Sequence, residues 1–309
     1  MQPCQLPPPL QPGDWLAVIA PSGALRERDA LEKGMQIWQA RGYHLRLCAG
    51  YDDRWGYLAG TDQARRDQFA TALQDPDCKA LLCLRGGYGG ARLLEDWQWP
   101  PQTQTVPKWL IGFSDITSLL WGLACEGISG LHAPLLTTLY AEPDWSVQRL
   151  FDWLEGRNIE ALQGKGWGGG QATGLLLPAN LTVATHLLGT ALQPDLTDTI
   201  LAFEDVSEAP YRIDRMLTQW RMMGAFRGVK GIVTGRFSQC EPTPPIPSFT
   251  VAEVLRDRLS DLGIPIVSDL SFGHEGENPA LPVGTAVELD GDQGILKFRG
   301  ADRYSQDLV

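Results

Sequence analysis

The sequence predicts an α/β fold with two domains, a parallel-sheet N-terminal domain followed by a smaller α/β domain with mixed strands. Three observations predict this fold. The chain has 309 residues, which is long for a single hydrophobic core. Short apolar runs alternate with helical patterns through the first half. Beyond about residue 143 this alternation gives way to a glycine-rich stretch, GKGWGGGQATG, so the fold is expected to change there.

The first half of the chain predicts strands that alternate with helices. Buried strands are predicted at short apolar runs, at residues 15–21, 43–48, 80–84 and 109–112. Helices are predicted where apolar residues recur every three or four positions, at residues 29–41, 62–74 and 117–125. Strands joined in this way pair in parallel with right-handed crossovers, as in a doubly wound sheet. Ligands of such sheets bind at the carboxyl ends of the strands, so we expect the site there.

The second half predicts a different order of elements. Residues 1–145 are expected to form the N-terminal domain, 146–173 a linker and 174–309 the C-terminal domain. Helices are predicted at residues 145–154, 179–188, 211–223 and 251–262. Strands are predicted at residues 199–204, 231–236, 264–268, 286–290 and 294–298, the last two joined by the turn GDQG.

Composition and charge exclude several classes of function. Lys and Arg total 26 against 37 Asp and Glu, and the net charge of −11 would repel a phosphate backbone. The six cysteines contain no Cys-x-x-Cys pair, so neither a zinc site nor a disulfide framework is predicted. No window is apolar enough to span a membrane, and the N-terminus lacks a signal-like region. We expect a cytoplasmic protein without nucleic-acid or membrane partners.

The first candidate loop is RGGYGG, residues 85–90, between a predicted strand and a helix. Glycines let backbone N–H groups approach a ligand, and a helix N-terminus favours negative charge. The loop therefore predicts an anion site, although a tight strand–helix turn would have the same composition.

The second loop is GFSD, in which Ser114 follows a strand and precedes a helix. A serine on such a turn presents its hydroxyl as a nucleophile, and the next N–H, that of Asp115, faces a developing oxyanion. Ile116 stands where the G-x-S-x-G elbow has its second glycine, so the turn is not the standard one. The alternative is that Ser114 caps the following helix.

The third loop is GHEGEN, residues 273–278, which offers His274 as a general base. Of the other histidines, His44 and His186 fit strand and helix patterns, and His132 remains a rival base at a strand end. The stretch LAFEDV provides Glu204 or Asp205 as the carboxylate that orients the imidazole. Successive strand residues point to opposite faces, so only one of the two would meet the histidine, and both could instead be solvated.

Together these motifs carry a resemblance. RGGYG, GFSDIT, LAFEDV with PYRIDRML, and FGHEGEN with LPVG follow one another in an order that resembles the LD-carboxypeptidase family, serine peptidases of family S66. The resemblance spans nearly the whole chain. It implies a Rossmann-like (flavodoxin-like) N-terminal domain, a catalytic triad of Ser114, Glu204 and His274, and a site between the domains.

The resemblance also implies an activity. The family releases the terminal D-alanine of murein tetrapeptides in cell-wall recycling, without metal or other cofactor, in the cytoplasm and usually as a homodimer. In this chain the backbone N–H of Asp115, with one from Gly86 or Gly87, would hold the oxyanion.

One departure and two alternatives accompany the resemblance. Where the family usually has Gly-Gly-Asn, this chain has Pro178, Ala179 and Asn180, which bears on substrate preference. A sister branch that resembles microcin-immunity proteins cleaves peptidyl or aminoacyl nucleotide amides with the same triad. A binding module for anions or peptides, built on RGGYGG, is the non-enzymatic alternative. Trp167 lies in a glycine-rich stretch that could either approach a substrate or act as a flexible connection.

Overall fold

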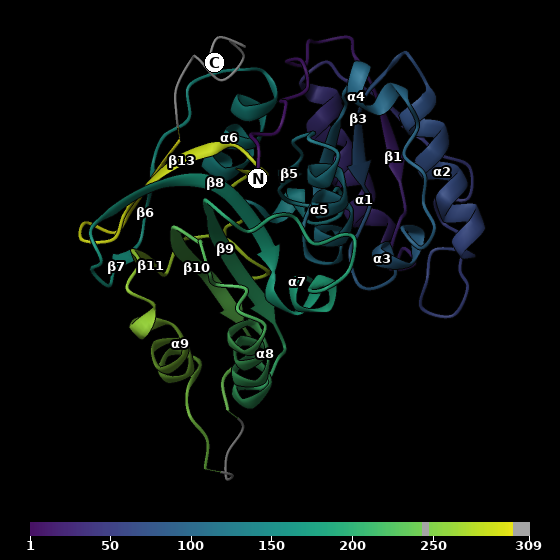
Figure 1. Ribbon diagram of the computed structural model, residues 1–309. Coiled ribbons are helices and arrows are strands. Elements are labelled where there is room, and N and C mark those ends of the chain that lie inside the picture. The colour runs from purple at the N-terminus through teal and green to yellow at the C-terminus, as the bar shows by residue number, and fades with distance from the viewer. Residues whose placement is uncertain (243–246, 299–309) are drawn as a thin grey trace. The chain divides into compact units, whose positions relative to one another are not determined.

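The computed structural model describes residues 1–242 and 247–298, and these fall into two compact units (Figure 1). The N-terminal unit comprises Cys4–Ile159 together with Pro279–Val283. The C-terminal unit comprises Met1–Pro3, Glu160–Asn278 and residues 284–298. The predicted C-terminal domain thus gives five residues to the other unit, and its residues 299–309 lie outside the described part of the chain.

The N-terminal unit is built on a six-stranded sheet in the order β12-β5-β4-β3-β1-β2. The strands are β1 (Trp15–Ile19), β2 (His44–Leu47), β3 (Cys78–Cys83), β4 (Trp109–Gly112), β5 (Leu131–His132) and β12 (Leu281–Pro282). The first five are parallel to one another, and β12 is antiparallel to β5. All four residues of β4 are buried, which explains why its sequence, WLIG, is continuously apolar.

Helices pack on this sheet and complete the doubly wound arrangement that the alternating pattern predicts (Figure 1). They are α1 (Arg28–Ala40), α2 (Asp62–Gln74), α3 (Gly90–Leu93), α4 (Gln102–Thr105), α5 (Thr117–Cys125) and α6 (Asp144–Leu154). The short 3-10 turns η1 (Ser114–Ile116) and η2 (Leu139–Ala141) lie between them.

The C-terminal unit has an eight-stranded mixed sheet in the order β6-β14-β13-β8-β9-β10-β11-β7. Its strands are β6 (Leu162–Gln163), β7 (Lys165–Gly166), β8 (Gln171–Asn180), β9 (Thr199–Val206), β10 (Gly231–Ser238), β11 (Ile266–Ser268), β13 (Ala286–Asp290) and β14 (Ile295–Phe298). Strands β8 to β11 are parallel, and the other pairs are antiparallel. The helices are α7 (Leu181–Leu187), α8 (Pro210–Met222) and α9 (Val251–Leu259), with η3 (Ser260–Leu262). The predicted fold class, with a parallel N-terminal sheet and mixed C-terminal strands, is confirmed.

The largest difference from the predicted elements lies in β8. Its ten residues run from the glycine-rich stretch to Asn180, where we expected an irregular segment and a helix from residue 179. The Asn180 side chain accepts a hydrogen bond from the Val183 N–H, 3.1 Å away, and so caps α7, which begins at Leu181. Residues 146–173, expected as a linker, hold most of α6, then β6, β7 and the start of β8.

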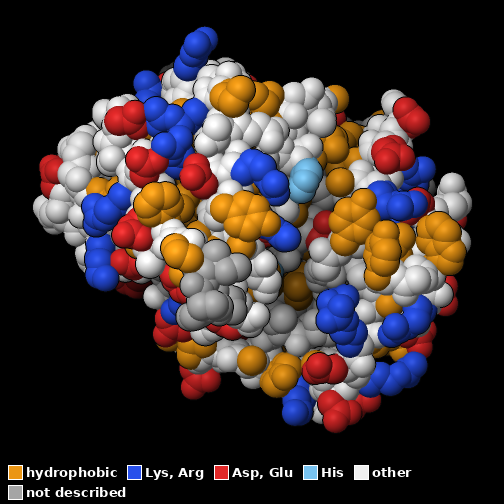
Figure 2. Space-filling model, turned by 90° about the horizontal axis from the view of Figure 1, so that it is seen from below, with side chains coloured by type: hydrophobic (Ala, Val, Ile, Leu, Met, Phe, Trp, Pro, Cys, Tyr) orange, Lys and Arg blue, Asp and Glu red, His pale blue; other side chains and the backbone are white. Residues whose placement is uncertain are grey.

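Charges of both signs share the surface. On the face shown in Figure 2, acidic and basic side chains are interspersed, with hydrophobic side chains between them. Along the described ranges, 1–242 and 247–298, no helix is both long enough and apolar enough to cross a membrane.

Candidate active site

The sharp turn that carries Ser114 connects β4 with α5. Ser114 is one of the few non-glycine residues with a left-handed backbone, at φ +64°, and its side chain is partly exposed. The N-cap position of α5 is held by Ile116, so Ser114 does not occupy the capping position that was its alternative role. A strained residue on a strand–helix turn is the backbone arrangement of a nucleophile elbow.

The glycine-rich loop after β3 packs against this turn. A Cβ placed on Gly86 would lie 3.2 Å from Ser114 Cβ and 3.3 Å from Ser114 Oγ, so the loop backbone reaches the serine because residue 86 has no side chain. Gly87 has a φ of +112°, a backbone conformation that would be strained in a residue with a side chain. The structure therefore brings Ser114 and Gly86 together.

Asp115 connects three segments beneath the serine. Its side chain is buried, and its Oδ2 accepts hydrogen bonds from Ser22 Oγ at 2.6 Å and from the Gly90 N–H at 2.7 Å. Its backbone carbonyl accepts a bond from Ser118 Oγ at 2.8 Å. Burial raises the pKa of the Asp115 carboxyl, against the lowering effect of these donors. Asp115 thus joins the loop after β1, the start of α3 and the nucleophile turn.

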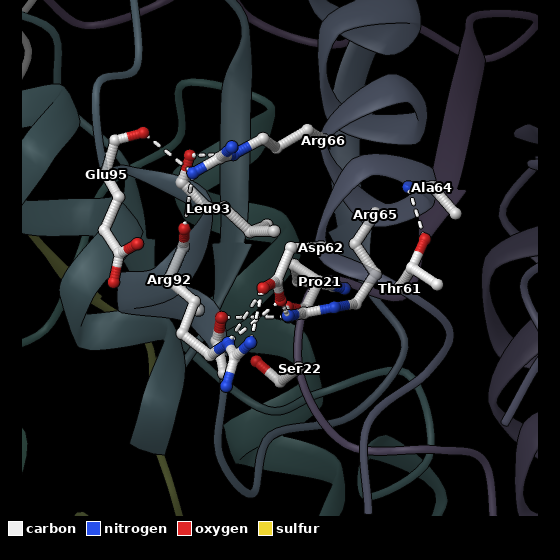
Figure 3. Close-up of polar contacts among 12 residues, drawn as sticks. Pro21, Ser22, Thr61, Asp62, Ala64, Arg65, Arg66, Arg92, Leu93 and Glu95 are labelled. Atoms are coloured by element: carbon white, nitrogen blue, oxygen red, sulfur yellow. Dashed lines mark hydrogen bonds and ion pairs between the residues drawn. The ribbon is translucent and has the colours of Figure 1, made fainter. Parts of the chain in front are cut away.

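A second link between the same loops comes from Arg65 of α2 (Figure 3). The Arg65 guanidinium is fully buried, donates to the backbone carbonyls of Pro21 and Gly89, and forms an ion pair with Asp62. Asp62 also accepts from Arg92 Nε at 2.9 Å. Sequence inspection did not identify this cluster, because a charged residue on an amphipathic helix is ordinarily exposed.

The C-terminal unit brings His274 and Glu204 together. The Nδ1 of His274 lies 2.6 Å from Oε2 of Glu204, whose side chain is fully buried, while the His274 side chain is 18% exposed. A carboxylate only accepts hydrogen bonds, so the proton of this pair is on Nδ1 and Nε2 faces away from Glu204. Burial lowers the pKa of His274, but the charge of Glu204 and its hydrogen bond outweigh burial, and the net pKa is raised.

Asp205, the other candidate carboxylate, has different partners. Its Oδ2 accepts from the backbone N–H and the hydroxyl of Thr182, both at 2.8 Å. Burial, together with the neighbouring charge of Glu204, raises the pKa of Asp205 to about 6. Asn180 Nδ2 donates to both carboxylates, to Glu204 at 3.2 Å and to Asp205 at 3.1 Å. The two acids therefore share Asn180 as a donor, whereas the contact with His274 Nδ1 is made by Glu204 and the contacts with Thr182 by Asp205.

The loop that carries His274 is held from β10. Arg236 donates to the backbone carbonyl of Glu277 at 2.6 Å and to its side chain at 3.1 Å. Gly273 has a φ of +132°, and a Cβ there would lie 3.3 Å from Glu204 Oε2, so glycine allows the loop to pass close to the carboxylate. Asn278 accepts from the Gly273 N–H at 3.1 Å.

The remaining candidates lie in other environments. His132 is fully buried in β5 and packs edge-on against Phe113, whereas His44 and His186 are exposed. Trp167 donates from Nε1 to Ser268 Oγ at 2.8 Å, and the Arg256 guanidinium lies over its ring, so its stretch is anchored. Within the described residues no group of three His, Cys, Asp or Glu side chains is arranged to hold a metal ion.

The two sets of residues have complementary chemistry. Ser114 is a partly exposed hydroxyl on a strained turn beside a glycine-rich backbone, an arrangement suited to a nucleophile with N–H donors nearby. His274 and Glu204 form an oriented imidazole–carboxylate pair, an arrangement suited to a general base.

Two family models match the chain. The model of the LD-carboxypeptidase N-terminal domain matches residues 16–133, and that of the LD-carboxypeptidase C-terminal domain matches residues 173–289. A putative carboxypeptidase of Synechocystis is 58% identical over 292 residues, which cover 94% of this chain and 96% of the relative.

Solved structures have the same fold. A muramoyltetrapeptide carboxypeptidase from Oxalobacter formigenes matches with a TM-score of 0.82 and 28% identity, over 93% of this chain and 99% of the other. The microcin C7 self-immunity protein MccF, in complex with aspartyl sulfamoyl adenosine, matches with a TM-score of 0.84 and 19% identity, over 96% and 99% of the two chains.

Proposed function

Because the chain belongs to the LD-carboxypeptidase family and is a serine carboxypeptidase, we propose that it releases the terminal D-alanine from murein tetrapeptides. The observation that carries the proposal is the 2.6 Å contact between His274 Nδ1 and Glu204 Oε2, which orients the imidazole as the carboxylate of a catalytic triad does. The muramoyltetrapeptide carboxypeptidase of Oxalobacter formigenes supports the choice of substrate.

In the proposed mechanism Ser114 Oγ attacks the carbonyl of the bond before D-alanine. His274 Nε2 takes the hydroxyl proton and then gives it to the leaving amine, so D-alanine departs and an acyl-enzyme ester remains. Water, deprotonated by the same imidazole, cleaves the ester and restores the serine. Glu204 keeps the imidazole in the Nδ1–H tautomer and stabilises the imidazolium.

Backbone N–H groups would stabilise the oxyanion that forms in both steps. The donors proposed are the N–H of Asp115 and one N–H of Gly86 or Gly87, each worth roughly 3 kcal/mol in comparable sites. The close approach of Gly86 to Ser114 supports this choice. The hydrogen bonds that hold Asp115 would keep the donors aligned.

The biological setting is a proposal as well. The activity would serve cell-wall recycling in the cytoplasm, and the protein would act as a homodimer, which light scattering at micromolar concentration would detect. A second candidate reaction is cleavage of aminoacyl nucleotide amides. This chain shares its fold with MccF, which was solved in complex with aspartyl sulfamoyl adenosine. For that reason the second reaction is included in the experiment below.

One experiment separates the candidates. The purified protein is incubated with murein tetrapeptide and, separately, with an aminoacyl nucleotide amide, and the products are analysed by mass spectrometry. Loss of one D-alanine from the tetrapeptide is expected, with no release by the Ser114→Ala variant. Cleavage of the nucleotide amide alone would favour the second candidate, and binding of either compound without cleavage would favour a non-catalytic module.

A further inference from the structure

Three arginines of the N-terminal unit converge beside the glycine-rich loop. Arg85 begins that loop and donates from its guanidinium to the Ala24 carbonyl at 3.4 Å, and Arg54 donates to the Leu25 carbonyl at 3.2 Å. Arg26 is the next residue along the same segment. Within the described residues, no carboxylate forms an ion pair with Arg26, Arg54 or Arg85. The cluster therefore holds concentrated positive charge in a chain whose net charge is −11.

The position of Arg85 is specified by its neighbours. A Cβ on Gly23 would collide with the Arg85 guanidinium, and one on Gly87 would lie 3.2 Å from its Nη1, so two glycines make room for it. The side chain is half-buried, and burial, together with the charges of Arg26 and Arg54, lowers the pKa of Arg85. Water and neighbouring acids compensate the charge of Arg85 less than they compensate the charge of an exposed arginine. An anion bound here would therefore be attracted more strongly.

Arg85 adjoins, along the chain, the residue that lies close to the proposed nucleophile. Its neighbour Gly86 approaches Ser114 Cβ and Oγ to 3.2 and 3.3 Å, measured from an added Cβ. In a peptide that loses its last residue, the terminal carboxylate is only two bonds beyond the scissile nitrogen. It therefore lies within about 4 Å of the carbonyl that is attacked. A planar guanidinium binds a carboxylate with two parallel hydrogen bonds, which fixes both its place and its orientation.

We propose that Arg85, supported by Arg26 and Arg54, binds the free α-carboxylate of the leaving amino acid and so restricts cleavage to the C-terminal bond. This specificity role rests on the proposed function. It explains how a hydrolase with an ordinary serine mechanism acts as a carboxypeptidase rather than an endopeptidase. An endopeptidase substrate has no charge at that position and would leave the half-buried guanidinium without a bound carboxylate.

The test compares a tetrapeptide that ends in D-alanine with the same peptide ending in D-alaninamide. For the wild type, kcat/KM is expected to be on the order of 100-fold higher for the acid, the range for a hydrogen-bonded charged pair. Arg85→Ala should lower kcat/KM for the acid by a similar factor and leave that for the amide nearly unchanged. Arg85→Lys should restore part of the preference, because it keeps the charge without the fork.

The matched control is Arg28→Ala, which removes a nearby exposed arginine whose charge is already paired with Asp52. This variant should keep the wild-type preference for the acid. If Arg85→Ala slowed cleavage of both peptides equally, Arg85 would only hold the loop in place and the inference would be wrong. An unchanged acid-to-amide ratio in Arg85→Ala would contradict it too.

A binding measurement separates this inference from the proposed reaction. Ser114→Ala protein, with and without Arg85→Ala, is titrated with both peptides by calorimetry. Tighter binding of the acid that disappears with Arg85→Ala supports the inference whether or not turnover occurs, and equal binding of acid and amide contradicts it. Absence of D-alanine release by the wild type would contradict the proposed function alone.

Discussion

At the scale of single residues, the proposed nucleophile provides the most direct prediction. Ser114→Ala removes one hydroxyl from a partly exposed side chain and changes little packing. The release rate should fall on the order of 10⁴-fold, as when a triad serine is deleted, while circular dichroism stays unchanged. More than about a tenth of the wild-type rate in a D-alanine release assay would show that another group is the nucleophile.

The adjacent acids Glu204 and Asp205 provide a matched pair of variants. Glu204→Gln should lower kcat by several orders of magnitude, because an amide does not hold the imidazole in its working tautomer. Asp205→Asn weakens hydrogen bonds to Thr182 and should cost about 1 kcal/mol of stability with little effect on rate. Release assays and urea unfolding of both variants measure these effects. A larger loss of rate in Asp205→Asn would reverse the proposed roles.

The pH dependence of the reaction follows from the His274 environment. A general base works when neutral, so kcat/KM should rise as pH passes the pKa of His274, which lies above its ordinary 6.5 because of Glu204. Glu204→Gln removes the largest of the charges that raise this pKa, together with Glu204's hydrogen bond, whereas burial, which lowers the pKa, remains. The midpoint of the residual activity should therefore move to lower pH. A pH–rate profile of the variant with an unchanged midpoint would mean that another group sets it.

At the scale of elements, Asp115 joins the loop after β1 to the start of α3. Asp115→Ala leaves the Ser22 hydroxyl and the Gly90 N–H buried without an acceptor, at a cost of about 2–4 kcal/mol. The glycine-rich loop should then lose its alignment, and the release rate should fall at least 10-fold. Asp115→Asn retains one acceptor oxygen at this position, so its stability and its release rate should both fall less than those of Asp115→Ala. Urea midpoints and release rates are measured for both variants, and wild-type values for Asp115→Ala would show that the carboxyl does not position the loop.

The elements show how far the sequence alone leads. Period-three and period-four spacing predicted α1 and α2, and continuous apolar runs predicted β1, β3 and β4, because these elements depend on local burial. Strand β8 was missed because it directly follows a glycine-rich segment, residues 164–170, and because the residues of β13 and β9 with which it pairs are far along the chain. Strand β12 has two residues and exists only through its pairing with β5, which no local pattern reveals.

The candidate site was predictable to a similar extent. Turn and loop composition identified Ser114 and His274 as candidates, but the alternation of strand side chains left Glu204 and Asp205 equivalent. The choice between them depends on the loop at Gly273, which passes within contact distance of Glu204. The sequence places Arg85 in RGGYGG but does not reveal the contacts of Arg65 and Arg85, because their partners include backbone carbonyls of distant loops.

At the scale of the whole molecule, the chain does not divide at one point. Residues 279–283 return to the N-terminal unit, where β12 pairs with β5, Arg149 Nε donates to the Ala280 carbonyl, and Ser129 Oγ donates to that of Val283. A fragment of residues 4–159 should therefore be less stable than the same fragment with residues 279–283 tethered to it. The expected difference is about 2–3 kcal/mol, from a few buried hydrogen bonds and apolar side chains.

Urea unfolding of the two fragments measures this difference. A tether that carries Leu281→Asp is the control, because it keeps the length of the chain and places a charge where a fully buried leucine packs. Equal midpoints for the plain and the tethered fragments would show that the returning strand adds nothing to this unit.

The left-handed backbone of Ser114 has a consequence for protein engineering. Glycine adopts a φ of +64° without strain, so Ser114→Gly would relieve the turn while removing the proposed nucleophile. A library selected only for heat resistance would therefore enrich a substitution that makes the protein inert. Selection for thermostability in this chain needs a simultaneous screen for turnover, because at this position stability and reactivity are opposed.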